Sequence, residues 1–181
     1  MRVLRANRAA ALALLPPRLH HYLQGRIMVS VWYPEEDYLD LLRALSRILP
    51  KRNGSIYEFM GRQGARMDLK GVYRHMVFPG DPAATLKRCA LYWHNYHDTG
   101  RCLVTIEGPG QARVDITSYE MTSPEMCEVQ LGWYLEALRI AGAPKATIQH
   151  TRCVMKKEPW CRYEVRWQAS RIATPESPAA R

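Results

Sequence analysis

A chain of 181 residues, 47% of them hydrophobic, is most simply one domain with its own core. Most of the net charge of +9 lies outside residues 28–168, where 19 basic and 16 acidic side chains nearly balance, so no nucleic-acid partner is expected. Five cysteines, an odd number in a chain of this size, exclude a disulfide framework and favour a reducing, cytoplasmic location.

Residues 1–27 are predicted to be a basic extension, because they hold five arginines and no acidic residue. Their apolar run, Ala9–Leu15, is only seven residues long, too short for a convincing signal or transit peptide. We expect this segment to be disordered, or to precede a true start at Met28. The single folded domain would then cover residues 28–168, followed by a disordered tail, residues 169–181, rich in Ala, Ser and Pro.

Helices are predicted in the first half of the domain by apolar residues that recur at helical spacing. The first begins at Pro34, where the acidic residues that follow favour the helix dipole, and ends before Pro50. Another begins with Asp81 as its cap and Pro82 at its first helical position, and continues to Tyr96.

Between these two, a second helix is predicted from Ser55, which opens a capping box, to Met76. Gly61 and Gly64 weaken this helix by roughly 1 kcal/mol each relative to alanine. We therefore expect either close packing against a neighbouring element at the two glycines or a break in the helix near Asp68.

After residue 100 the apolar residues alternate, which predicts β-strands. The alternating apolar residues of a first hairpin are Cys102, Val104, Ile106, Ala112, Val114 and Ile116. A helix from Ser123 to Gly142 and two more strands, over 146–152 and 161–168, complete the domain. This order predicts an α+β fold in which N-terminal helices pack on a four-stranded antiparallel sheet of β-β-α-β-β order.

Four ligands for a soft metal gather in the last third of the chain: Cys127, His150, Cys153 and Cys161. Zinc takes four such nitrogen and sulfur ligands in tetrahedral geometry at structural sites. Cys153 and Cys161 flank a turn, and Cys127 lies near a helix N-terminus, where the dipole favours the thiolate. His150 and Cys153 would face opposite ways on a regular strand, so a shared metal requires a bend or bulge near Thr151.

Two other interpretations of these residues are open. Buried free cysteine is common in protein cores, and Cys127 alone fits such a position. Under oxidation, Cys153 and Cys161 would form a disulfide across a hairpin instead of binding metal.

The stretch from Ser123 to Trp167, SPEMC…LGWYLEAL…GA…IQHTRCVMKKEPWCRYEVRW, resembles the C-terminal core of the 4-vinyl reductase domain. That domain is the small-molecule-binding module of phenol-sensing transcriptional activators, and it is related to haem–nitric-oxide-binding domains and transport-particle subunits. Upstream, WYPEEDYLDLLRAL, GRQGARMDL and YHDTG look like uncharacterised bacterial proteins built on the same module. The resemblance covers roughly residues 30–168 and implies a bacterial ligand-binding domain.

The resemblance also implies a structural zinc. In the phenol sensors zinc is held by a cysteine, an acidic residue three before a second cysteine, and a third cysteine eight further on. Cys127, Cys153 and Cys161 match those cysteines, and His150 stands in the place of the acidic ligand. Haem is not expected, because the sequence lacks the Tyr-x-Ser-x-Arg signature of haem–nitric-oxide domains.

An aromatic ligand would require a pocket lined by aromatic and polar side chains. The candidate pocket residues are His75, Trp93, His94, Tyr96, His97 and Tyr134. The alternative is that Trp93 and Tyr96 belong to the core, whereas His94 and His97 are solvated.

No nucleophile elbow, phosphate-binding loop or dinucleotide fingerprint is present, and no stretch of sequence is long enough to span a membrane. We expect a zinc-braced sensory or regulatory module that binds a small apolar or aromatic ligand and signals through a partner or a homodimer. One alternative is a protein-interaction scaffold of the transport-particle type. Another is an accessory protein of vinyl-group reduction in tetrapyrrole synthesis.

Overall fold

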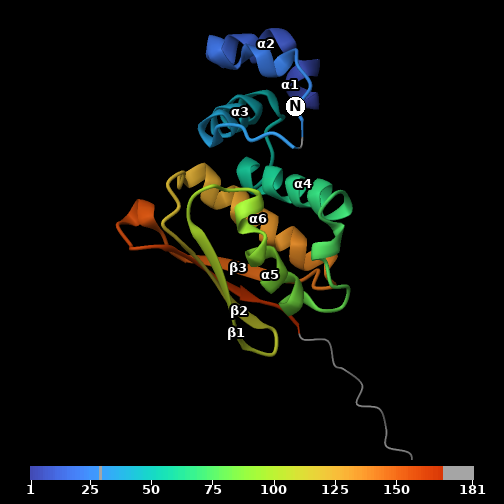
Figure 1. Cartoon of the computed structure of the whole chain (residues 1–181), viewed down its shortest axis with the longest axis vertical. Helices are drawn as coiled ribbons and strands as arrows, with labels where there is room; N and C mark the ends of the chain where they lie inside the picture. The colour runs from blue at the N-terminus through green and yellow to red at the C-terminus, as the bar shows by residue number, and fades with distance from the viewer. Residues whose placement is uncertain (29, 169–181) are drawn as a thin grey trace, which may run out of the picture.

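The structure is a computed structural model that describes residues 1–28 and 30–168 (Figure 1), so the tail predicted to be disordered lies outside the described residues. Its helices are α1 (Arg2–Ala6), α2 (Arg8–Leu14), α3 (Glu35–Ile48), α4 (Ile56–Lys70), α5 (Pro82–Leu91) and α6 (Pro124–Ile140). Its strands are β1 (Arg101–Gly108), β2 (Gln111–Thr117), β3 (Thr147–Arg152) and β4 (Cys161–Arg166). Short 3-10 turns are η1 (Pro17–Leu23), η2 (Arg74–Met76), η3 (Trp93–Asn95) and η4 (Val154–Lys156).

The strands form one antiparallel sheet with the spatial order β1-β2-β4-β3. Alternate side chains of the two central strands are buried on one face, as the sequence pattern predicted; they are Ala112, Val114 and Ile116 of β2 and Cys161, Tyr163 and Val165 of β4. An α+β fold with a four-stranded antiparallel sheet is therefore confirmed.

The helices are layered differently from the prediction (Figure 1). Helices α5 and α6 contact the sheet, α4 packs on α6, and α1, α2 and α3 form a further layer beyond α4. The prediction that the N-terminal helices lie on the sheet was wrong for α3 and α4, because α6 already occupies that face and α4 packs on α6 instead. Of the helices formed by residues 1–28 and 30–168, none has the length and apolar character needed to cross a membrane.

The helix starts follow the predicted caps. Ser55 accepts hydrogen bonds from the backbone of α4, Asp81 does so for α5, and Ser123 does so for α6. The helix ends come earlier than predicted: α4 stops at Lys70 and α5 at Leu91, and each is followed by a 3-10 turn. The side chains beyond these ends therefore leave the helical faces on which the spacing had placed them.

The N-terminal segment predicted to be a disordered extension is helical. Leu4 and Leu19 are almost completely buried in a small core shared with α3. Arg18 forms salt bridges to Asp37 and Asp40 of α3, so the acidic partners that the segment lacks come from another element. The segment and α3 together form a layer that we call the N-terminal cap.

Glycines allow α4 and α6 to touch backbone to backbone. A Cβ atom on Gly61 would lie 2.0 Å from the carbonyl oxygen of Val129, and one on Gly132 would lie 2.0 Å from that of Glu58. Neither position can hold a larger residue unless a helix moves. The close packing expected at Gly61 is therefore confirmed.

Replacing Gly132 by alanine tests this contact. Gly132→Ala is expected to lower the free energy of unfolding by about 1–3 kcal/mol, because the new methyl group must push α4 away from α6. Chemical denaturation followed by circular dichroism measures the change. Gly108→Ala is the control, because a Cβ there meets nothing within 4 Å. Equal stability of the two variants would contradict the proposed contact.

Candidate metal centre and ligand cavity

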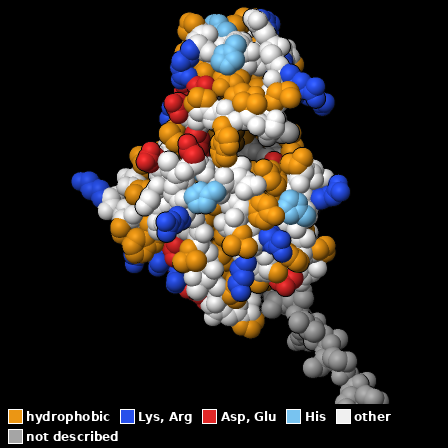
Figure 2. Space-filling model, in the orientation of Figure 1, with side chains coloured by type: hydrophobic (Ala, Val, Ile, Leu, Met, Phe, Trp, Pro, Cys, Tyr) orange, Lys and Arg blue, Asp and Glu red, His pale blue; other side chains and the backbone are white. Residues whose placement is uncertain are grey.

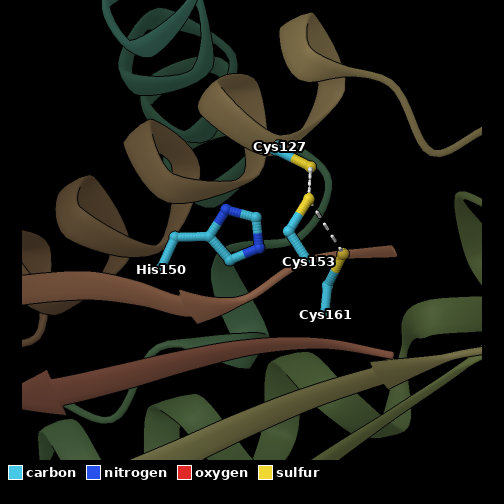
Figure 3. A group of neighbouring side chains, drawn as sticks. All are labelled: Cys127, His150, Cys153 and Cys161. Atoms are coloured by element: carbon cyan, nitrogen blue, oxygen red, sulfur yellow. Dashed lines mark hydrogen bonds between the residues drawn. The ribbon is translucent and has the colours of Figure 1, made fainter. Parts of the chain in front are cut away.

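Three elements bring the four predicted metal ligands together (Figure 3). Cys127 lies in the first turn of α6, His150 lies on β3, Cys153 follows the end of β3, and Cys161 begins β4. The three cysteines are buried and none is in a disulfide. We call these four residues the Cys/His cluster.

A bulge in β3 allows His150 and Cys153 to face the same side. His150 pairs with Tyr163 and Arg152 pairs with Arg162, so Thr151 is an extra residue in the ladder. The irregularity that a shared metal requires at this point is therefore present. The imidazole ring of His150 stacks on the Tyr163 ring at 4.3 Å and 10°, which fixes its orientation.

The dimensions of the Cys/His cluster suit one tetrahedral ion. The four candidate ligand atoms lie within 4.8 Å of one another. Cys127 Sγ and Cys161 Sγ are 3.9 and 4.0 Å from Cys153 Sγ, and zinc–sulfur bonds of about 2.3 Å in a tetrahedron place sulfurs roughly 3.8 Å apart. His150 Nε2 is buried and has no hydrogen-bond partner. A bound cation would satisfy that nitrogen.

Contact between Cys127 and Cys161 shifts the pKa values of their two thiols in opposite directions. The Cys127 thiol beside it, and then His150, lower the pKa of Cys161. The same contact with Cys161, together with burial, raises the pKa of Cys127. Both shifts arise from the close contact of the two thiols, so the expectation that the helix dipole favours a Cys127 thiolate stays a prediction.

A cavity of about 1090 Å³ separates the N-terminal cap from the layer formed by α4 and α6. It is visible as the hollow between the upper and lower parts of Figure 2. Its wall includes Gly61 and Gly64 of α4 and Gln130, Trp133 and Tyr134 of α6. Both helices that meet at the glycine contact therefore line it.

Four of the six predicted pocket residues line this cavity: Trp93, Tyr96, His97 and Tyr134. His75 and His94 are not among the lining residues. His94 is exposed on the 3-10 turn η3, because α5 ends before it, and His75 packs on Tyr92 at 5.1 Å.

His97 is held in place rather than solvated. Its Nδ1 donates a hydrogen bond to Glu35 Oε1, with 2.5 Å between the two atoms. Its ring centre lies 4.1 Å from that of Trp93 and 4.9 Å from that of Tyr119. The Trp93 indole in turn donates to the backbone oxygen of Thr99 at 2.9 Å. The alternative of a solvated His97 is thus wrong, and Trp93 belongs to both the core and the cavity wall.

Among the polar residues of the cavity that sequence reasoning missed are Glu35, Asp68 and Gln130. Asp68 accepts a hydrogen bond from the Trp133 indole at 3.1 Å, and burial raises its pKa. Glu35 had been interpreted only as a favourable charge at a helix start. The glycines that precede Asp68 were the one available signal, because they indicated that this face of α4 is packed.

Three buried polar atoms of the cavity residues have no hydrogen-bond partner: Glu35 Oε2, Tyr96 Oη and Gln130 Nε2. Buried polar groups in folded proteins are nearly always paired, so each such atom requires an explanation. A ligand that carries both donors and acceptors would supply the missing partners.

Solved structures identify the architecture. No family model matches the sequence, and no curated protein matches it. An oxygen-binding H-NOX domain related to soluble guanylate cyclases superimposes with a TM-score of 0.63 at 11% identity, over 93% of this chain and 90% of that one. An H-NOX protein from S. oneidensis in the Fe(II)NO state gives 0.59 at 17% identity, over 92% of this chain and 96% of that one. The chain has the H-NOX fold.

At such low identities the similarity concerns the fold and carries no residue assignments. The alignment covers 93% of this chain, which is a larger share than residues 28–168 make up. It therefore includes part of the N-terminal cap. The resemblance to 4-vinyl reductase domains stays a prediction.

Proposed function

We propose that this chain is a sensory or regulatory module that binds a small aromatic molecule in its cavity and is braced by a structural zinc ion. The observation that carries the proposal is the cavity, with three unpaired buried polar atoms and with Trp93, Trp133 and Tyr134 in its wall. Small-molecule sites have about this size and composition. An oxygen-binding domain among the H-NOX neighbours also favours a ligand-binding role.

The donor set favours zinc in the Cys/His cluster. Three thiolates and one imidazole complete its tetrahedral shell and leave no position for water, which is typical of a structural rather than a catalytic site. The ion would join the start of α6 to β3 and β4. Since such a site does not exist in the unfolded chain, its binding free energy would add to the stability of the fold.

Serine variants test the zinc. Cys153→Ser and Cys161→Ser are each expected to lose the ion and to unfold at lower temperature, because serine is a poor zinc ligand. Native mass spectrometry of protein purified without chelators measures the ion, and calorimetry measures the unfolding temperature. Cys89→Ser, which changes a buried thiol outside the cluster, is expected to keep the zinc. A metal-free wild type would contradict the proposal.

Haem, which is named for two of the similar structures, does not fit the described cavity wall. His97 is available as an axial ligand, since its Nδ1 is held by a carboxylate, as is usual for metal-bound histidine. The described lining residues, however, include six carboxylates, of which Asp37 is paired with Arg18, and no Lys or Arg side chain that could pair with the two haem propionates. Unpaired like charges in one cavity disfavour the bound state, so we derive no role for haem.

A haemin titration tests this conclusion. Purified protein is expected to give no saturable Soret band at one equivalent of haemin, because the carboxylates of the wall repel the propionates. Absorption spectroscopy of wild type and His97→Ala measures it. A one-to-one band that disappears in His97→Ala would show that haem is the cofactor after all.

A scaffold that binds another protein is the second candidate function. Trp32 and Met67, which both line the cavity, are 63% and 77% exposed. Exposed apolar side chains that cluster often mark interaction surfaces. A scaffold of this kind would hold its partner without any response to small aromatic molecules.

Filling the cavity separates the two candidates. A thermal-shift panel of small aromatic compounds is expected to contain stabilisers of the wild type that lose their effect in Gly64→Leu, because the leucine side chain would occupy the site. A Cβ on Gly64 meets only the Trp133 ring, at 3.9 Å, so the variant is expected to fold. Gly108→Leu, outside the cavity, is the matched control and keeps the response. A flat panel would favour the scaffold.

A further inference from the structure

We infer that the cavity selects an aromatic ligand with a positive charge, such as a protonated aromatic amine, over neutral and anionic aromatics of the same size. This inference rests on the proposed function, because it names the class of ligand for the same cavity. The charges, the unpaired atoms and the aromatic residues of the wall each support it.

The charged side chains of the cavity wall are predominantly acidic. Its carboxylates are Glu35, Glu36, Asp37, Asp68, Asp98 and Glu120. No Lys or Arg is among the described residues that line the cavity. The basic groups there are His97, which is bonded to Glu35, and the N-terminal amine of Met1, whose pKa burial lowers. A mobile cation is therefore the missing partner of this wall.

Two of these carboxylates are placed to receive a ligand. Asp37 is excluded, because Arg18 and Tyr22 already bind it. Glu35 uses Oε1 for His97 and leaves Oε2 buried and unpaired. Asp68 accepts a hydrogen bond from the Trp133 indole but forms no salt bridge in the described structure.

The remaining wall suits the body of an aromatic amine. Trp93, Trp133 and Tyr134 line the cavity, and the face of an aromatic ring attracts a cation, more strongly as water is excluded. Gln130 is more than nine-tenths buried, and its Nε2 donor is unpaired. The ligand therefore also carries an acceptor, such as a hydroxyl oxygen, in addition to its cationic group.

An anionic ligand is opposed by the same features. A carboxylate or phosphate in this cavity would leave Glu35 Oε2 without a donor and would add repulsion from Asp68. Selectivity would thus come both from attraction of a cationic ligand and from repulsion of an anionic one.

Three compounds with one phenol ring test the inference: tyramine, 4-propylphenol and 4-hydroxyphenylacetate. At neutral pH they are a cation, a neutral molecule and an anion of similar size. Isothermal titration calorimetry is expected to show tyramine bound at least about tenfold more tightly than 4-propylphenol, and 4-hydroxyphenylacetate bound most weakly. Hydrophobic transfer alone would favour 4-propylphenol, so this order is specific for charge.

Charge-removing variants locate the selectivity. Glu35→Gln and Asp68→Asn keep the size of each side chain and are expected to reduce tyramine affinity about tenfold while changing 4-propylphenol affinity little. Glu164→Gln, which removes a carboxylate on β4 outside the cavity, is the control and is expected to change neither.

The outcomes separate the inference from the proposed function. Equal binding of the three phenols, or tightest binding of 4-propylphenol or the anion, overturns the charge selectivity and leaves a ligand-binding cavity standing. If other aromatic compounds of the wider panel stabilise the protein but tyramine does not bind, the charge selectivity is likewise overturned and the ligand-binding cavity stands. A flat panel together with no binding of any phenol overturns both.

Discussion

The backbone contact between α4 and α6 determines where the functional groups of this protein lie. Gly61 and Gly132 let the two helices approach more closely than any side chain would allow. The contact places Asp68 of α4 against Trp133 of α6 and makes both helices part of one cavity wall. The wall therefore depends on the fit of two backbones, which leaves little freedom for rearrangement.

Helix α6 also connects the cavity with the Cys/His cluster, because it carries Cys127 at its start and Gln130 one turn later. Tyr163 lies between them and is completely buried. Its ring stacks on His150, and its hydroxyl lies 3.2 Å from both the carbonyl oxygen of Cys127 and Oε1 of Gln130. The candidate metal centre and the candidate ligand site are therefore neighbours in the packing. An ion that orders the start of α6 would also order the wall of the cavity.

Several features followed from the sequence because they depend on local geometry. The caps at Ser55, Asp81 and Ser123 were visible as side chains that bond to the backbone two or three residues later. The bulge beside Thr151 was required as soon as His150 was assumed to share a metal with its neighbours, since side chains on a regular strand alternate. The early ends of α4 and α5 were missed, because they depend on contacts beyond the helix.

The sequence by itself determined the strands, the helix starts and the set of four candidate metal ligands, because spacing along the chain decides which way neighbouring side chains point. Only the tertiary structure decided the N-terminal cap, since Arg18 finds its acidic partners on α3. It also decided the charge of the cavity. Glu35, Asp68 and Gln130 come from three different helices, and whether each is buried, paired or free depends on elements far away in sequence.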